Sequence, residues 1–222
     1  MDNNDSSVKF LNIGFDLKFC SNLKKALNMI NYEYIIYLQD DYFFSNIVNT
    51  SSIEDHLKHC IKNNLDFLKI DHYTNTRDNF RINSSDYCLN PIDAKYSIDT
   101  SASIWNKNTL TKLCIDGWDG WDFERKIITH ISKNKIVLKS EILHSSVYPE
   151  KGIKYVHSTA VCRGRWTQSG VQYLHENGFD YLISNRPIQG VITTFLLTLY
   201  KPNKLLYMPI SIIIKIFQWF NL

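Results

Sequence analysis

The sequence has no uninterrupted apolar run of the roughly 20 residues that a transmembrane helix needs, and it has no block of Lys and Arg. A net charge of +3 is too mild for a nucleic-acid-binding protein, because such proteins usually carry a concentrated basic patch. No internal repeat is found. We therefore expect no nucleic-acid partner and no repeat architecture.

The cysteines lack the spacing of a structural site. There are five of them, an odd number, and they form no CxxC pair and no zinc-ligand pattern. Scattered free thiols are typical of a reducing compartment. The N-terminal stretch Met1–Ser7 is acidic and polar, unlike a signal peptide. These features predict a cytoplasmic protein, with a peripheral place at the inner face of a membrane left open by the C-terminal tail.

The order of predicted elements indicates the fold class. With 222 residues and 44% hydrophobic content, the chain can form one sizeable domain. Strands are predicted at Val8–Phe15, Tyr34–Leu38 and Leu65–Ile70, and helices begin near Ser21 and at the capping-box pattern of Ser51. Alternating strands and helices predict an α/β fold with a mixed, mainly parallel sheet flanked by helices, in which Tyr34–Leu38 is a buried central strand.

The second half of the chain continues with less regular elements. Residues 72–95 are polar and read as a long surface excursion, and a short helix is predicted at Asn108–Cys114. A strand is predicted at Lys135–Ser140. A later helix of about ten residues should end at Gly178, because glycine is favoured just past a helix C-terminus.

Two adjacent carboxylates, Asp40 and Asp41, end the apolar strand Tyr34–Leu38. Ligands of open α/β sheets collect beyond the carboxyl ends of strands. Neighbouring acids repel each other and need water, a cation, a proton or basic groups. A divalent metal, Mn²⁺ or Mg²⁺, is a suitable partner. An Asp-rich turn without a ligand explains the pair equally well.

A second acidic cluster spans Asp116–Glu124 and contains four carboxylates, two Trp and two Gly. The helix dipole favours acids at a helix start and accounts for one or two of them. It does not account for the tryptophans, and the glycines let the backbone approach a ligand. The cluster therefore predicts a ligand-binding surface at the start of a helix.

Three motifs resemble those of one enzyme family. Gln39-Asp-Asp-Tyr-Phe43, Trp121-Asp-Phe-Glu124 and Arg163-Gly-Arg-Trp166 are similar, in this order, to motifs of nucleotide-sugar glycosyltransferases with the glycosyltransferase-A fold, family-2-like. The resemblance covers roughly Phe10–Pro187. It implies a glycosyltransferase-A-like domain, a Rossmann-like half, over residues 1–187.

The resemblance also implies an activity. The chain would move a sugar from a nucleoside-diphosphate sugar to a glycan or lipid-linked acceptor in surface polysaccharide synthesis, with a divalent metal and with inversion. The implied roles are a metal ligand (Asp41), donor-binding residues (Gln39, Asp40, Asp41, Arg163, Arg165), a base (Glu124 or Asp122) and acceptor-binding residues (Trp105, Trp121). This mechanism requires the acids near residue 40 and those near residue 122 to face one opening.

Some of these roles have plain structural alternatives. Trp105 can be a core anchor, and Arg163 and Arg165 can be ordinary surface charges. The family's first strand, loop and helix, which hold the nucleobase, are not recognised before Asp40. The chain would therefore be a short form of the domain, or it would take that half from a partner. Residues 188–222 form an apolar tail that either contacts a membrane surface or docks as a helix.

Two other functions remain open. A metal-dependent phosphodiesterase or nucleotidyltransferase also places acids at strand ends, and it would be favoured if His56, His59 or His144 converged on the acid pair. His56 and His59 could share a helix face as ligands, but a solvated helix flank is the favoured interpretation. The third possibility is a catalytically impaired, membrane-associated binding domain.

Overall fold

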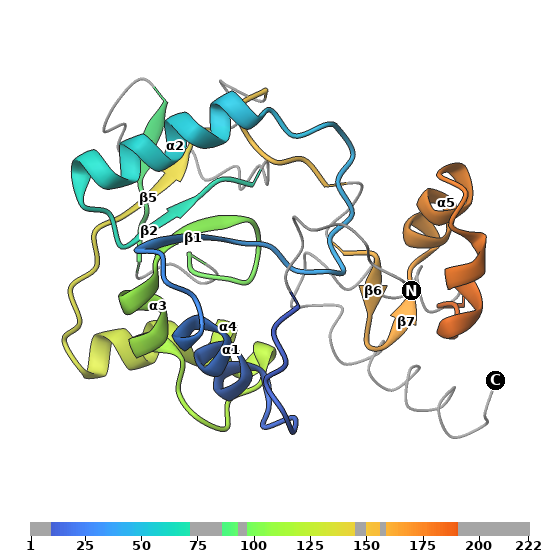
Figure 1. Cartoon of the computed structure of the whole chain (residues 1–222), viewed down its shortest axis with the longest axis horizontal. Coiled ribbons are helices and arrows are strands. Elements are labelled where there is room, and N and C mark those ends of the chain that lie inside the picture. Colours follow the sequence, from blue (N-terminus) through green and yellow to red (C-terminus); the bar gives the residue numbers. More distant parts are fainter. Residues whose placement is uncertain (1–9, 72–85, 93–96, 145–149, 156–158, 191–222) are drawn as a thin grey trace, which may run out of the picture. The chain divides into compact units, whose positions relative to one another are not determined.

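The chain divides into two compact units. The computed structural model describes residues 10–71, 86–92, 97–144, 150–155 and 159–190 (Figure 1). Unit 1 comprises Met1–Gln39 and Asn46–Lys154, and unit 2 comprises Asp40–Ser45 and Tyr155–Leu222. The expected apolar tail falls almost wholly outside the described residues, so the predicted boundary after residue 187 stays a prediction. Within the described ranges, no helix is both long and apolar enough to cross a membrane.

Unit 1 contains a five-stranded sheet in the order β1-β4-β2-β5-β3. Three of its strand pairings are antiparallel, and β2 with β5 is the parallel one. The sheet is therefore mixed but mainly antiparallel. The predicted α/β class is confirmed, whereas the prediction of a mainly parallel sheet is wrong. The strands are β1 (Tyr34–Tyr37), β2 (Phe67–Lys69), β3 (Tyr87–Leu89), β4 (Ser103–Asn106) and β5 (Ser140–Leu143).

The position of β4 explains the difference. Strand β4 pairs antiparallel with both β1 and β2, so β1 and β2 run in the same direction, as the crossover through a helix predicts. They are not direct neighbours, however, because β4 lies between them. Strand β1 is consequently at the edge of the sheet rather than at its centre, and Ile36 in it is 44% exposed.

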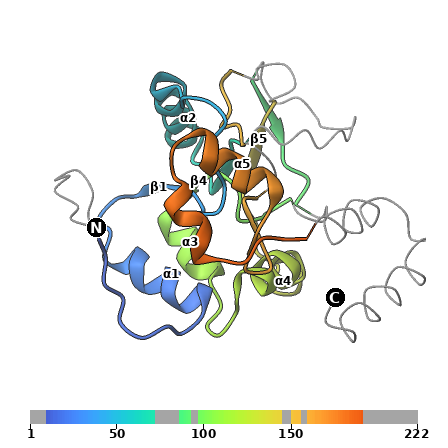
Figure 2. The ribbon, with the colours of Figure 1, turned by 90° about the vertical axis from the view of Figure 1, so that its right-hand side faces the viewer.

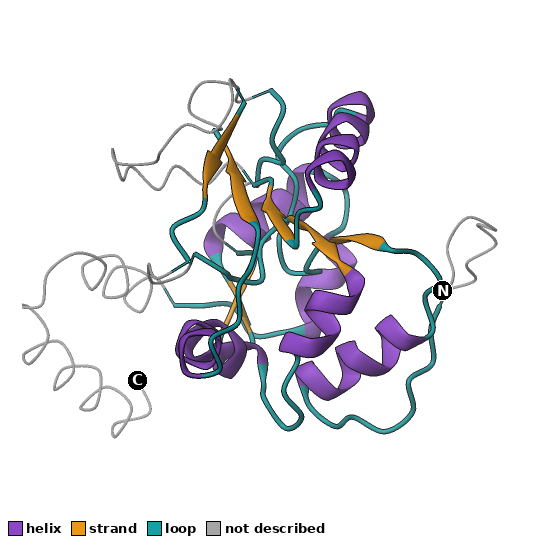
Figure 3. Cartoon of the chain, turned by 90° about the vertical axis from the view of Figure 1, so that its left-hand side faces the viewer, coloured by secondary structure: helices purple, strands orange, loops and turns teal. Residues whose placement is uncertain are grey.

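Helices cover both faces of this sheet. Helix α2 lies on one face, and α1, α3 and α4 lie on the other (Figures 2 and 3). A large cluster of buried apolar side chains lies on the second face, where α4 contributes Phe123, Ile127 and Ile131. The helices are α1 (Phe19–Asn28), α2 (Thr50–Asn63), α3 (Lys107–Leu113) and α4 (Gly120–Lys133).

Helix ends follow local capping chemistry. Helix α2 begins one residue before the predicted capping box, because Asn49 is the N-cap and its side chain accepts a hydrogen bond from the Ser52 amide. It ends at Asn63, and the C-cap residue Asn64 has a left-handed φ of 50°. Helix α4 begins after Asp119, which accepts from the Asp122 amide. The predicted helices therefore exist, with ends displaced by one or two residues.

Two predicted strands differ from the structure. In Val8–Phe15, the described residues 10–15 form no strand, and Phe15 is 91% exposed. The predicted strand Lys135–Ser140 starts only at Ser140, because Phe67 pairs with Ser140 at the beginning of β5. Residues 136–139 instead approach the sheet as irregular backbone. In both segments the described backbone carries an apolar pattern but is not part of a strand ladder.

Unit 2 is built around a short hairpin of β6 (Val161–Cys162) and β7 (Arg165–Trp166). The two linking residues, Arg163 and Gly164, have φ of 51° and 74°, the signature of a tight hairpin turn. A small core of Ala160, Trp166 and Leu174 joins the hairpin to helix α5 (Gln168–Glu176), which is followed by the 3-10 helix η1 (Asp180–Asn185). Gly178, with a φ of 74°, follows the end of α5 as predicted.

Candidate functional site

Polar residues gather at one end of the strands of the unit 1 sheet. Tyr37, Ser103 and Lys69 are aligned across β1, β4 and β2. The chain therefore leaves β1 and β2, and enters β4, at this same end of the strands. Gln39 follows β1 there, and Asp71 follows β2. Asp71 thus follows a strand as Asp40 and Asp41 do, although it was not among the predicted site residues.

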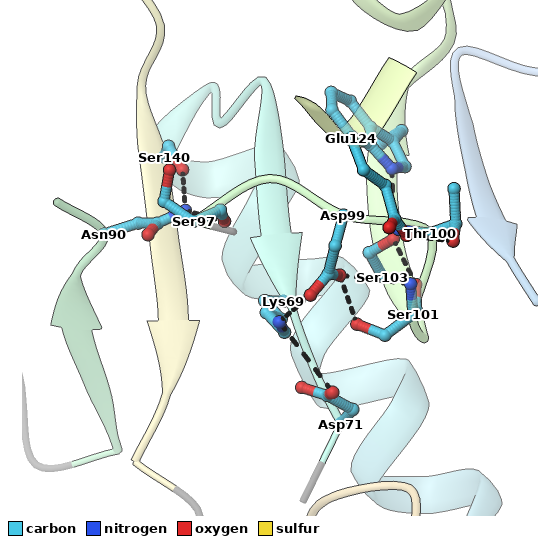
Figure 4. A network of polar contacts seen from close by, with 11 residues as sticks. Lys69, Asp71, Asn90, Ser97, Asp99, Thr100, Ser101, Ser103, Glu124 and Ser140 are labelled. Atoms are coloured by element: carbon cyan, nitrogen blue, oxygen red, sulfur yellow. Dashed lines mark hydrogen bonds and ion pairs between the residues drawn. The ribbon is translucent and has the colours of Figure 1, made fainter. Parts of the chain in front are cut away.

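A largely buried ion network lies at this end of the strands (Figure 4). Lys69, 3% exposed, forms an ion pair with Asp99, and its Nζ lies 3.9 Å from the Asp71 carboxylate. The other oxygen of Asp99 accepts from the Ser101 amide at 3.1 Å and from the Ser101 hydroxyl at 2.6 Å. The network thus fixes the turn formed by Asp99–Ser101 just before β4.

Glu124 reaches the same turn from helix α4. Its Oε1 accepts two hydrogen bonds from Thr100, one from the amide at 3.1 Å and one from the hydroxyl at 2.5 Å. Among the described residues, no donor is found for Oε2. One oxygen is therefore held in place, while the other remains available to accept a proton.

Asp122 lies on the same helix but in different surroundings. Its carboxylate forms ion pairs with Lys126 at 2.8 Å and with Arg125 at 3.7 Å, both on α4. The hydrogen bond from Lys126 lowers the pKa of Asp122 below its ordinary value. A carboxylate with these partners is a poor proton acceptor. Of the two predicted base candidates, the geometry favours Glu124.

The carboxyl group of Asp71 carries an unsatisfied atom. Asp71 is 3% exposed, and within the described residues its Oδ1 has no hydrogen-bond partner. Burial raises the pKa of this carboxyl to about 6, although the charge of Lys69 opposes the shift. The charges of Asp99 and Glu124 also act on Lys69, so among the described residues its ammonium faces several carboxyl groups.

Asp41 lies in unit 2, where Thr159 holds it. The Thr159 hydroxyl donates to Oδ2 at 2.9 Å, and the backbone carbonyl of Asp41 accepts from the Ala160 amide at 2.6 Å. Its Oδ1 is buried and has no partner within the described part of the chain. Burial raises the pKa of Asp41, because a desolvated carboxylate is costly. Asp40, beside it, is exposed.

The same unit carries exposed arginines. Arg163 is in the hairpin turn and Arg165 is on β7, and both are exposed. Arg186, which sequence analysis missed, lies 5.8 Å from the centre of the Trp166 ring, and its charge partly offsets the effect of burial on the pKa of Asp41. A Pro-flanked arginine in a polar segment gives no sequence signal for this position.

Asp41 suits a divalent metal that is shared with substrate phosphates and water, rather than a metal held by protein side chains alone. No group of three or more His, Cys, Asp or Glu side chains able to hold a metal occurs in the described ranges. Mg²⁺, however, is usually held by one or two carboxylates together with substrate phosphates and water. A buried, unpartnered carboxylate oxygen such as Oδ1 of Asp41 suits that arrangement.

The two predicted acceptor-binding tryptophans have opposite surroundings. Trp105 is 1% exposed, packs on Phe67 with ring centres 4.3 Å apart, and donates its Nε1–H to the Ser103 hydroxyl. It has no open ring face, which fits the core-anchor alternative. Trp121 is 62% exposed at the start of α4, so its ring is accessible.

The prediction that the histidines of helix α2 lie on a solvated flank is wrong. His56 is 1% exposed, and its ring nitrogens lie 2.8 Å from the Tyr87 hydroxyl and from the Lys151 carbonyl. His59 contacts Glu141 at 2.6 Å through Nε2 and Asn63 through Nδ1. The sequence could not show this, because these partners come mostly from distant elements. All four ring nitrogens are engaged, so neither histidine supports the phosphodiesterase alternative.

Comparisons with protein-family models, with curated proteins and with solved structures gave no match for this chain. The geometry of the site is therefore the basis for a functional proposal. The predicted meeting of Asp40 and Asp41 with Glu124 at one opening stays a prediction, since these residues belong to different units.

Proposed function

We propose that this chain is a metal-dependent glycosyltransferase of the glycosyltransferase-A type. It would transfer a sugar from a nucleoside-diphosphate sugar to a hydroxyl of a glycan or lipid-linked acceptor in surface polysaccharide synthesis, with inversion at the anomeric carbon. The observation that carries the proposal is the buried, unpartnered Oδ1 of Asp41, in the unit that also carries exposed Arg163 and Arg165. Carboxylate and arginine together suit a metal-bound diphosphate.

The proposed roles are those that the family resemblance implies. Asp41 would hold Mn²⁺ or Mg²⁺, with Gln39 and Asp40 near the nucleotide, and the arginines would contact the diphosphate. The metal, when bound, would stabilise negative charge on the departing diphosphate. Trp121, with its exposed ring, would face the acceptor sugar.

Glu124 would act as the base. The acceptor hydroxyl oxygen forms a bond to the anomeric carbon, the bond from that carbon to the diphosphate breaks, and the diphosphate leaves with the electron pair. The hydroxyl proton passes to Oε2 of Glu124, because Oε1 is held by Thr100. General base catalysis of this kind typically contributes a factor of about 100 to 10,000 in rate.

A thermal-shift screen tests the proposal. The full chain is heated with UDP-, GDP- and dTDP-linked sugars, each with and without Mn²⁺. A ligand at about ten times its Kd stabilises a protein by about 1.4 kcal/mol, so at least one sugar nucleotide should raise the Tm in a manganese-dependent way. Stabilisation by none of them at millimolar concentration would refute the proposal. Binding without any transfer to an acceptor would instead support the impaired binding domain.

A further inference from the structure

The turn at Asp99–Ser101 joins two parts of unit 1 (Figure 4). On one side, Asp99 accepts from the amide and hydroxyl of Ser101, which closes the turn. On the other side, the middle residue of the turn, Thr100, directs its amide and its hydroxyl to Oε1 of Glu124. The position of the turn therefore sets the position of the Glu124 carboxylate.

Lys69 anchors this turn to the sheet. It lies on β2, which has a neighbouring strand on each side, and its ammonium contacts the second oxygen of Asp99. Burial opposes the charged form of Lys69, but the nearby carboxylates of Asp71 and Asp99 outweigh it and raise its pKa. The charged form of the lysine is therefore favoured, and it stands on a strand that is paired on both sides.

Stability alone is a weak explanation for this arrangement. Removing two charges from water is costly, and apolar residues of similar volume often replace buried ion pairs without loss of stability. The network is also incomplete, since Oδ1 of Asp71 has no partner within the described residues. What the ion pair does provide is a fixed orientation, because it holds the Asp99–Ser101 turn against the Glu124 carboxylate.

We propose that Lys69 and Asp99 are positioning residues that hold Thr100 against Glu124. Their effect is to fix one carboxylate oxygen and to leave the other oriented toward the acceptor hydroxyl. The catalytic part of this inference rests on the proposed glycosyltransferase function, whereas the coupling from Lys69 to Thr100 is a property of the fold. The two parts can therefore be tested separately.

The coupling is tested by amide hydrogen exchange in the full chain. Lys69→Met removes the ammonium and keeps most of the apolar stem. We expect the Thr100 amide to exchange at least about tenfold faster in this variant, while amides in the middle of α2 keep their wild-type rates. Unchanged exchange at Thr100 in the folded variant overturns the inference, whatever the activity of the protein.

The catalytic part is tested by kinetics with the sugar nucleotide that the screen identifies. Lys69→Met should lower kcat by about 10-fold to 100-fold, with the acceptor KM changed less than about twofold, because misplacing a catalytic group affects mainly turnover. Thr100→Val removes only the hydroxyl donor and should also lower kcat, and Thr100→Ser should restore it. Equal kcat values in Thr100→Val and the wild type overturn this part.

The two proposals fail in distinguishable ways. If the wild-type chain binds and transfers no sugar, the proposed function fails, and the exchange experiment still decides whether Lys69 holds the turn. If the wild type is active but the variants keep its kcat, the function stands and the positioning role fails. Should Lys69→Met not fold, Asp99→Asn carries the exchange measurement, because it removes the charge on the other side of the ion pair. The Thr100→Val and Thr100→Ser pair still carries the kinetic measurement.

Discussion

Thr100 donates two hydrogen bonds to a single oxygen of Glu124, one from its backbone amide and one from its hydroxyl. A glutamine at this position can accept both bonds through its amide oxygen, but it cannot take up a proton. Glu124→Gln should therefore keep the wild-type Tm and lower the transfer rate by about 100-fold to 10,000-fold. Initial rates with a sugar nucleotide measure this.

Asp122→Asn is the matched control for this prediction. Asp122 lies on the same helix, but its carboxylate is engaged by Lys126 and Arg125 at the surface. We expect its transfer rate to stay within about threefold of wild type, because exposed ion pairs contribute little. A larger loss in Asp122→Asn than in Glu124→Gln would assign the base to Asp122 instead.

Asp41→Asn should abolish the manganese-dependent part of the thermal shift. The amide oxygen still accepts from the Thr159 hydroxyl, but the negative charge that attracts the metal is lost. Without metal, the variant should be at least as stable as wild type near neutral pH, since burial penalises the carboxylate. Asp55→Asn, which alters an exposed ion pair with Lys58, should keep the full shift. An undiminished shift in Asp41→Asn contradicts the assignment.

The raised pKa of Asp71 predicts that the free energy of unfolding decreases as the pH rises. Its folded-state pKa of about 6 is above the ordinary value of 3.8, so the folded protein holds this proton more tightly than the unfolded chain does. The resulting stabilisation is complete below 3.8 and is lost as the pH rises through about 6. It amounts to about 3 kcal/mol. Urea unfolding of wild type and Asp71→Asn across this range should show a flatter curve for the variant.

Gly170 in α5 should not tolerate a side chain. A Cβ there would lie 2.6 Å from the carbonyl oxygen of Ala160 and 3.1 Å from its Cα, so backbone would have to move. Gly170→Ala should lower the free energy of unfolding by about 1 to 3 kcal/mol, although alanine is the better helix former. Gly120→Ala, where the nearest atom is on Phe19 at 3.9 Å, should be neutral or stabilising. Equal melting temperatures for the two variants would contradict the packing seen at α5.

His56 should matter for stability as a buried hydrogen-bonding group. His56→Ala removes the bonds to Tyr87 and to the Lys151 carbonyl and leaves a cavity, and should lower the free energy of unfolding by about 3 kcal/mol. Burial lowers the pKa of His56. The unfolded chain therefore binds a proton more readily, and stability should fall as the pH drops below 6.5. His175→Ala, at an exposed histidine, is the control, and a comparable loss there would contradict this account.

Helix positions could be read from the sequence because helices depend on local interactions. The left-handed end of α2 at Asn64 and the start of α4 after Asp119 are set by hydrogen bonds and backbone preferences within a few residues. The strand that leads to Asp40 and Asp41 was also predicted, from its short β-branched and aromatic run. The acid pair was singled out from its place after this strand, whereas Glu124 was named as a base candidate only through the family resemblance.

Only the tertiary structure decided which strands are neighbours and which charges meet. Strand periodicity indicates the face on which a residue lies but not its partner, so the insertion of β4 between β1 and β2 could not be predicted. The same limit applies to Lys69 and Asp99, which lie 30 positions apart. Their ion pair, and with it the support of Glu124, exists because chain folding brings distant residues together at a largely buried place.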